Sequence, residues 1–201
     1  MVPCKKLHYP SQKFHTISID TFGEQALSCQ HGFKLVLTVI DRLSNFVQLF
    51  PLKTKSWKEI EKTLMLQWFQ IFGKPKEILA DNAFNQPEPR SWAEQHEIAF
   101  TYSGAHAHHQ NGHVERFHKY LVEQMKILKA ESGKECYSNR WTHYLPLIAL
   151  RYNVGVLSRR GVSPYEIVFG KSAAGVISVD YKSFSHKLDQ KIMNRLGCWT
   201  I

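Results

Sequence analysis

The strongest constraint on the fold is a helical pattern of apolar residues in the second half of the chain. Five of them recur three or four residues apart, the spacing of one face of an α-helix: Val114, Phe117, Leu121, Met125 and Leu128. A second stripe lies on the opposite side of that helix, and it consists of Glu115, Lys119, Lys126 and Lys129. The pattern predicts a helix from about 110 to 130 with a carboxylate at the head of a basic stripe. Taken alone, that stripe is most simply a solvated face.

Five short runs have the alternation or the continuous apolar character of β-strands. They cover residues 15–20, 33–40, 46–50, 77–80 and 98–102. The first three follow one another closely and predict an antiparallel meander, with Pro51 ending its third strand. The last two strands are separated by a helical stretch, which is typical of parallel neighbours.

Helices are predicted between and after these strands. The first spans 56–72, because Ser56 and Glu59 have the spacing of a capping box and apolar residues follow at helical intervals. The residues that this helix is expected to bury are Trp57, Ile60, Leu64, Trp68 and Ile71. Residues 83–90 are expected to form a loop. Further helices are expected at 91–96, 110–130, 137–153 and 163–170.

Composition narrows the class of protein. The 201 residues, 43% hydrophobic and with a net charge of +9, fit one globular domain with a polyanionic partner such as nucleic acid. No apolar run approaches the ~20 residues of a membrane span, and the N-terminus has no signal-peptide pattern. The four cysteines form no CxxC pair, which favours reduced thiols in an intracellular protein over disulfides or a complete zinc site.

Three carboxylates are the candidates for chemistry. Asp20 ends the first predicted strand, Asp81 follows the fourth, and Glu115 lies near the start of the long helix. If the first strand is central and the fourth lies beside it, the three acids converge at one edge of the sheet. Such a cluster needs cations, and oxygen ligands favour two Mg²⁺ or Mn²⁺ ions, which suit phosphodiester chemistry. Each acid alone is more commonly structural or solvated.

Five segments resemble, in the same order, those of a known family. They are 19–23 (IDTFG), 39–46 (VIDRLSNF), 78–82 (ILADN), 110–118 (QNGHVERFH) and 163–170 (SPYEIVFG). Together they resemble the catalytic core of retroviral-type integrases, most closely those of gypsy-class LTR retrotransposons, over roughly residues 10–172. The resemblance implies an α/β protein of the RNase H-like fold, with a five-stranded mixed sheet of three antiparallel and then two parallel strands, flanked by helices.

The resemblance also implies a function and a set of site residues. The reaction would be metal-dependent 3′-end processing of element DNA followed by strand transfer into target DNA. Asp20 would contact both Mg²⁺ or Mn²⁺ ions, and Asp81 and Glu115 one each. DNA would be held by Asn82, Gln110, Lys119 and Lys126. The family also implies a nuclear location and a homodimer or higher homo-oligomer.

Several features depart from the family. The interval between Asp81 and Glu115 is about two residues shorter than usual, Ala83 replaces an expected Gly, and the turn before the long helix is rich in histidine. A domesticated or decayed integrase domain that binds nucleic acid or protein without catalysis is therefore the alternative. A ribonuclease H proper fits the motifs less well.

The remaining predictions concern the histidine-rich turn and the two ends of the chain. A zinc site among His106, His108, His109, His113 and His118 is conceivable, but the HExxH order is absent, and contacts to phosphate or a helix cap are preferred. Residues 1–14 are expected to form a basic arm, in which Cys4 would be the last ligand if the arm is the remnant of a zinc-binding module. Residues 15–170 form the core, and 171–201 an extension of uncertain order.

Overall fold

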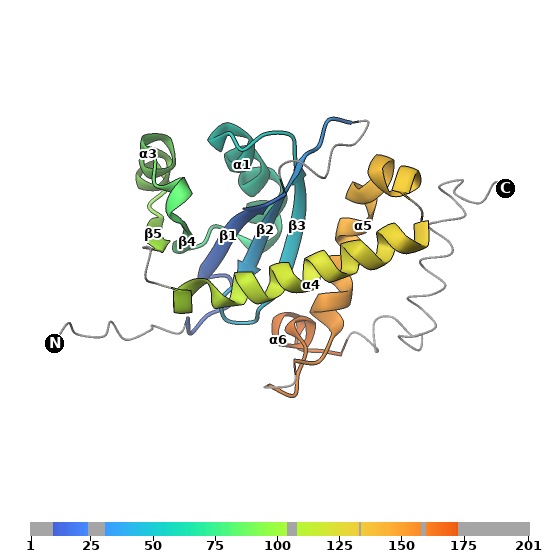
Figure 1. Cartoon of the computed structure of the whole chain (residues 1–201). Coiled ribbons are helices and arrows are strands. Elements are labelled where there is room, and N and C mark those ends of the chain that lie inside the picture. The colour runs from blue at the N-terminus through green and yellow to red at the C-terminus, as the bar shows by residue number, and fades with distance from the viewer. Residues whose placement is uncertain (1–9, 24–30, 104–107, 133, 158–159, 173–201) are drawn as a thin grey trace.

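The centre of the molecule is a mixed five-stranded sheet. The computed structural model describes residues 10–23, 31–103, 108–132, 134–157 and 160–172. The strands are β1 (Thr16–Phe22), β2 (Leu35–Asp41), β3 (Val47–Leu52), β4 (Glu77–Asp81) and β5 (Ala99–Ser103). Their order across the sheet is β3-β2-β1-β4-β5 (Figure 1). The β1–β2 and β2–β3 pairs are antiparallel, and the β1–β4 and β4–β5 pairs are parallel. The predicted sheet is confirmed, with β1 at its centre.

One face of the sheet is covered by the first group of helices. These are α1 (Trp57–Thr63), η1 (Leu64–Phe69), α2 (Gln70–Phe72) and α3 (Pro87–Gln95). Trp57, Ile60, Leu64 and Trp68 are buried there, as predicted. Ile71 was expected in the same stripe, but it is 70% exposed. The cause is η1, a π-helical turn, which adds a residue to the repeat and rotates the positions after it out of register.

The predicted capping box at the start of this helix is wrong. Ser56 is the N-cap, but its side chain makes no capping hydrogen bond. The Glu59 carboxylate instead accepts hydrogen bonds from the backbone N–H groups of Lys53 and Thr54 and from the Thr54 hydroxyl. These bonds lower the pKa of Glu59 against the opposing effect of burial, the largest influence on it. Glu59 therefore fixes the loop that leads into α1.

Residues 83–90 are not the loop that was predicted. Asn82–Phe84 form the short 3-10 helix η2, and α3 starts at Pro87, four residues before the expected start. Pro87 occupies a first-turn position, where its missing N–H has no helical partner to lose. Pro87 was expected to lie in a loop, but it starts α3.

The other face of the sheet is covered by α4 (His108–Ser132) and α5 (Lys134–Val154). The predicted apolar stripe of α4 is buried, with Phe117 and Leu121 completely so. It packs with α5 against alternate residues of β2 and β3, among them Val36, Ile40 and Val47. The opposite stripe of Glu115 and the lysines is exposed. In Figure 1, α4 runs across the sheet below the strands.

The outer edge of the sheet is closed by a side chain. Pro51 was expected to end the third strand, but β3 continues to Leu52 and Pro51 pairs with Val36. An edge strand accepts proline where its nitrogen faces away from the neighbouring strand. On the same edge, the buried Asn153 of α5 accepts from the Val47 N–H at 2.8 Å and donates to the Val47 C=O at 2.8 Å.

The last described helix is α6 (Pro164–Phe169), as the sequence predicts. Ser163 and Glu166 form a complete capping box, and Gly170 ends the helix in the left-handed conformation at φ 70°. Lys13, at the other end of the described chain, donates from its side chain to the C=O of Val168. Among the helices that the structure describes, none has the length and apolar character required to span a membrane.

Replacement of Asn153 tests the closure of the sheet edge. Asn153→Ala leaves a buried N–H and a buried C=O of Val47 without partners, so we expect the free energy of unfolding to fall by about 2–3 kcal/mol. Urea unfolding followed by circular dichroism measures this change. Gln70→Ala, a polar-to-alanine change at an exposed helical position, is the control and should stay within about 0.5 kcal/mol of the wild type. Equal effects of the two substitutions would contradict the structural role of Asn153.

Candidate active site

Two carboxylates lie on the neighbouring strands β1 and β4. Asp20 was expected to end the first strand, but β1 continues to Phe22, whereas Asp81 is the last residue of β4. Ile19 pairs with Ala80, and Asp20 and Asp81 are the next residues of these two parallel strands. One oxygen of Asp20 accepts from the Thr21 N–H at 2.7 Å, and one oxygen of Asp81 accepts from the Asn82 N–H at 2.6 Å. Each aspartate is thus held by the first backbone N–H that follows it. The adjacency expected from the sequence is confirmed for these two acids.

The charge on Asp20 is unfavourable in the folded chain. The pKa of Asp20 is raised to about 6, mainly by burial and in smaller part by the negative charge of Asp81. The hydrogen bond from Thr21 and the positive charge of Lys55 act in the opposite direction. The partial burial of Asp20 and the nearby charge of Asp81 therefore favour the uptake of a proton or a cation by Asp20.

His118 joins Asp20 to the helix that covers it. Its Nδ1 lies 3.8 Å from Oδ2 of Asp20, and its Nε2 lies 3.1 Å from the hydroxyl of Thr38. Thr38 is the residue opposite Asp20 across the β1–β2 pair, and it is completely buried. Burial lowers the pKa of His118 to about 4, so the ring is neutral at pH 7 and its approach to Asp20 is not an ion pair.

The role of His118 was missed in the sequence. It was expected to meet phosphate or to cap a helix, yet it lies within α4 and reaches the sheet. The available signal was its spacing from Glu115, because residues i and i+3 share one side of a helix. The structure also brings the positive charge of Lys55 close enough to lower the pKa of Asp20.

Glu115 does not form a ligand cluster with Asp20 and Asp81. It is exposed on α4, one turn before His118. Among the residues that the structure describes, no three His, Cys, Asp or Glu side chains form a group that could hold a metal ion. The third carboxylate therefore lies on the helix that contacts Asp20, outside a preformed ligand cluster.

The same finding bears on the predicted zinc alternative. His113 and His118 are the histidines of that group whose side chains are described, and burial is the main cause that lowers the pKa of each to about 4. Arg42, Arg116 and Arg160 lower the pKa of His113 further by their positive charge. His106 and the side chains of His108 and His109 lie outside the described part. The described histidines give the zinc interpretation no support.

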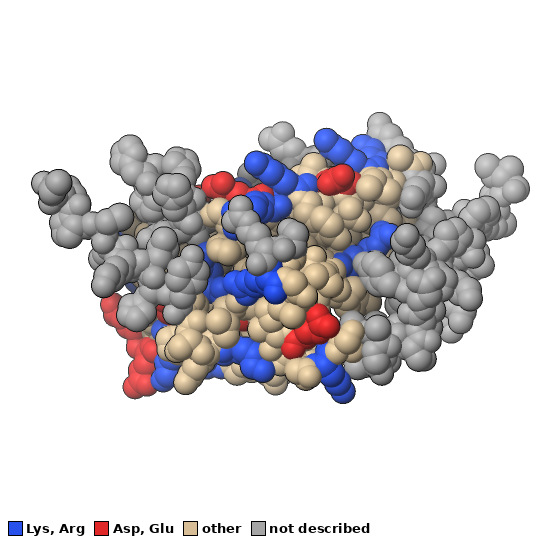
Figure 2. Space-filling model, turned by 90° about the horizontal axis from the view of Figure 1, so that it is seen from below, with Lys and Arg blue, Asp and Glu red and all other residues tan. Residues whose placement is uncertain are grey.

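The residues expected to hold DNA occupy different places. Asn82 is exposed at the start of η2, where its side-chain oxygen accepts from Asn85 at 3.2 Å. Lys119 and Lys126 are exposed on α4. Gln110 belongs to α4, but its side chain is not among those described. Figure 2, which views the molecule from below the view of Figure 1, shows lysine and arginine side chains spread across that face with acidic side chains among them.

Comparison with known proteins gives relatives in retroviral polyproteins. No protein-family model matches the chain. It is 32% identical over 143 residues to the Gag-Pol polyprotein of Gibbon ape leukemia virus, a match that covers 70% of this chain and 8% of that protein. It is 30% identical over 142 residues to the Pol polyprotein of Radiation murine leukemia virus (strain Kaplan), covering 70% of this chain and 24% of that one. The chain thus spans a small part of the curated relatives that it matches.

Solved structures share the fold. The HTLV-2 integrase catalytic core domain in complex with magnesium superposes with a TM-score of 0.58 at 18% identity, over 77% of this chain and 95% of that one. The catalytic core domain of BIV integrase gives a TM-score of 0.56 at 16% identity, over 77% and 93%. The simian T-cell lymphotropic virus intasome in complex with the PP2A regulatory subunit B56 gamma gives 0.62 at 16% identity, over 80% and 56%. The sheet and its helices are those of the RNase H-like integrase cores.

The raised pKa of Asp20 predicts how stability depends on pH. The folded chain holds this proton more tightly than the unfolded chain, whose carboxyl has the ordinary pKa of 3.8. The group's stabilising contribution is therefore full below pH 3.8 and lost as the pH rises through about 6. Asp20→Asn removes the charge and keeps an oxygen for the Thr21 N–H. In EDTA at pH 7.5, urea unfolding should show a gain of about 1 kcal/mol after allowance for screening.

Glu94→Gln is the matched control for that prediction. Glu94 is an exposed carboxylate on α3. Its replacement by glutamine should therefore leave the free energy of unfolding nearly unchanged, both at pH 7.5 and near pH 4. The gain from Asp20→Asn should shrink as the pH approaches 4. A loss of stability at pH 7.5, or a gain that does not depend on pH, would show that the Asp20 charge is not strained in the folded chain.

Proposed function

This chain belongs with the retroviral-type integrase catalytic cores, and on that premise we propose that it catalyses metal-dependent cleavage and joining of DNA strands. The reaction is 3′-end processing of element DNA followed by strand transfer into target DNA. The observation that carries the proposal is the Asp20–Asp81 pair, two carboxylates on neighbouring strands in which burial and the charge of Asp81 raise the pKa of Asp20. The finer likeness to gypsy-class elements remains part of the proposal.

The residues fit two Mg²⁺ or Mn²⁺ ions. Their donor atoms are carboxylate oxygens, the ligands that these hard cations prefer. Asp20 and Asp81 would hold them at the strand ends, and Glu115 would add a third carboxylate from α4. When bound, such ions supply activation of a water or a 3′-hydroxyl and stabilisation of the leaving oxygen. Among the relatives in fold, an integrase core in complex with magnesium supports the choice of cation.

The chain's own residues position this chemistry. The N–H groups of Thr21 and Asn82 orient Asp20 and Asp81. His118 fixes the distance between β1 and α4 through its contacts with Asp20 and Thr38. Because Glu115 precedes His118 by one helical turn, the same contact sets how close α4 can bring the third carboxylate to the pair. Phosphoryl transfer depends mainly on such positioning and on stabilisation of charge.

DNA is the proposed partner, both as element end and as target. Exposed Lys119 and Lys126 on α4 would neutralise backbone phosphates, with Asn82 and Gln110 beside the reacting end. A nuclear protein that works as a homodimer or higher homo-oligomer completes the proposal. The solved HTLV-2 integrase core has dimeric and trimeric forms, which supports the assembly.

A second candidate is nucleic-acid binding without catalysis. It is favoured by the segment after Asp81, where Ala83 replaces an expected glycine. This segment is a hydrogen-bonded turn in which Asn85 N–H donates to the Asn82 C=O and the Gln86 side chain donates to the Ala83 C=O. Ala83 sits in the 3-10 helix without a positive φ, so the replacement causes no strain. A turn fixed in this way adapts less readily to a substrate than a glycine loop.

Substitution of the three acids tests the catalytic proposal. Asp20→Asn, Asp81→Asn and Glu115→Gln remove one carboxylate charge each, so each should lower Mg²⁺-dependent nicking of a DNA end by at least about 100-fold. Binding of DNA, measured by fluorescence anisotropy, should persist. The control is again Glu94→Gln, which should retain activity. A wild-type chain that binds DNA and never nicks it would favour the second candidate, and activity in one variant would remove that residue from the catalytic set.

The two lysines of α4 give a separate prediction. Lys119→Ala and Lys126→Ala should each weaken DNA binding for every sequence and lower the slope of log affinity against log salt by about 1, because each removes one phosphate contact. Lys62→Ala, at an exposed position of α1 on the opposite side of the sheet, is the control. An unchanged slope for both α4 variants would place this helix away from the DNA.

A further inference from the structure

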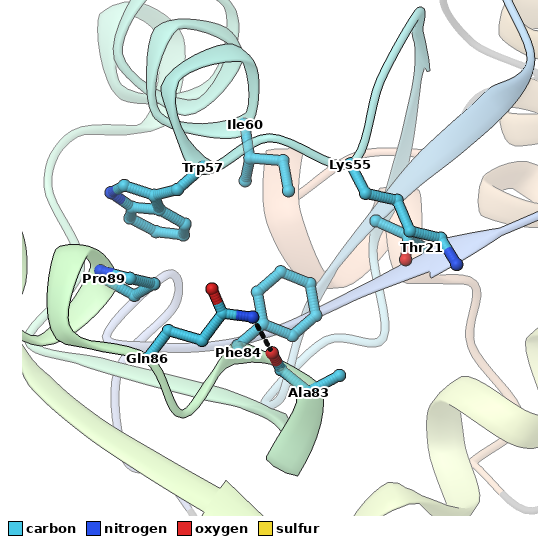
Figure 3. A pocket seen from close by; sticks show the side chains of 8 residues that line it. All are labelled: Thr21, Lys55, Trp57, Ile60, Ala83, Phe84, Gln86 and Pro89. Carbon is cyan, nitrogen blue, oxygen red and sulfur yellow. Dashed lines mark hydrogen bonds between the residues drawn. The ribbon is translucent and has the colours of Figure 1, made fainter.

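A small pocket opens on the α1 and α3 side of the sheet, near the residues that follow the two aspartates. Thr21, the residue after Asp20, and Ala83, the second residue after Asp81, both line it. In Figure 3, Lys55 and Thr21 lie on one side, Trp57 and Pro89 on the opposite side, and Phe84 and Gln86 along the lower edge. The pocket therefore joins the tip of β1, the start of α1 and the segment from η2 to α3.

The walls of the pocket are apolar and aromatic. Trp57 and Phe84 both line it, and they are 7% and 8% exposed. The Trp57 ring is held firmly, since it packs edge-on against Trp92 at 5.2 Å and Phe100 at 5.9 Å between ring centroids. Rigid aromatic walls favour a flat aromatic ligand, since it loses little freedom when it stacks there.

The rim of the pocket is polar and positively charged. The side-chain nitrogen of Gln86 donates to the Ala83 C=O at 3.1 Å. This bond turns the amide oxygen, an acceptor, toward the inside of the pocket (Figure 3). Lys55 brings a positive charge to the side nearest Asp20. A ligand with an aromatic ring, an amino group and a nearby phosphate complements these three features.

The size of the pocket restricts this ligand further. Its volume is about 180 Å³, below the roughly 300–1,000 Å³ of pockets that enclose a whole small molecule. One planar ring fits, and a complete nucleotide cofactor does not. If DNA is the ligand, as the proposed function requires, one base enters the pocket and the rest of the strand lies outside, with Lys55 between the pocket and Asp20.

We infer that this pocket receives one unstacked base of the DNA strand whose phosphodiester reacts at the two aspartates. The base carries an exocyclic amino group that donates to the Gln86 oxygen, and Lys55 neutralises the phosphate next to it. Other enzymes that act on DNA withdraw a base from the stack into a pocket, at a cost in unstacking energy. This inference rests on the proposed function, because it requires DNA at the acidic site.

The test uses the full chain and short DNA duplexes that each carry one 2-aminopurine. This fluorescent base has an exocyclic amino group and brightens when it leaves the stack. It is placed at successive positions near one end, and fluorescence is read with Mg²⁺ before product appears. The wild type should brighten the probe at one position or two adjacent positions. Ala83→Leu, which fills the pocket from an exposed position, should abolish this signal and slow nicking about tenfold, the equivalent of one base-stacking contact.

Matched controls separate the pocket from general damage. Ala130→Leu makes the same change at an exposed position of α4, and it should leave the signal intact. Gln86→Leu removes the acceptor at similar volume and should also reduce the signal, whereas Gln95→Leu on the exposed end of α3 should not. Thermal melting verifies that every variant is folded. If Ala83→Leu does not fold, the result with Gln86→Leu decides the test.

The possible outcomes are distinct. If the wild type binds and nicks DNA but no probe brightens, the pocket inference is wrong while the proposed function stands. A signal that persists in both Ala83→Leu and Gln86→Leu would also overturn the inference, because the base would then lie elsewhere. If the wild type neither binds nor nicks DNA, the proposed function fails first and the inference fails with it.

Discussion

The architecture depends on the position of β1 between an antiparallel and a parallel neighbour. Its pairing with β2 places Thr38 opposite Asp20, and its pairing with β4 places Asp81 beside Asp20. Because side chains alternate along a strand, Ile17 and Ile19 face the layer of α1 and α3, while Asp20 faces α4. One strand therefore supplies both the centre of a hydrophobic core and a carboxylate that the opposite helix can reach.

The same arrangement explains why the negative charge of Asp20 and Asp81 is only partly balanced in the folded chain. Burial and the proximity of Asp81 make ionisation of Asp20 unfavourable, while the neutral ring of His118 holds α4 at the sheet without adding a positive charge. Lys55 offsets part of the charge from the opposite side. A folded chain that keeps like charges together in this way is suited to a process that begins only when cations and a polyanion arrive.

Most of the fold could be predicted from the sequence, because the core is patterned with strong periodicity. The stripe from Val114 to Leu128 and the continuous apolar run of β2 allow few alternatives, and the short connections between the first three strands set their order. Asp20 and Asp81 were found for the same reason, since each follows a strand whose neighbours were evident. The errors have local causes. A π-helical turn inserted in a regular helix moved Ile71 to the surface, and Pro87 can serve a loop or a helix start equally well.

The rest of the candidate site depends on contacts between distant segments, which a single sequence does not encode in any spacing. Thr38 and His118 are 80 positions apart, and Lys55 acts on Asp20 through space. The resemblance to integrases assigned roles to the three acids and added the residues expected to hold DNA. It gave no indication of the pocket, which exists because the segment after Asp81 closes into η2 and brings Phe84 and Gln86 under α1.

The closed outer edge of β3 has a consequence for self-association. In an antiparallel strand, every second residue points its N–H and C=O away from its partner strand, and in β3 these residues are Val47, Leu49 and Pro51. Asn153 occupies both groups of Val47, and proline has no N–H. Leu49 alone in this strand offers a donor to an incoming chain, so this edge resists the addition of another strand. Two copies of this chain would therefore not join through their β3 edges.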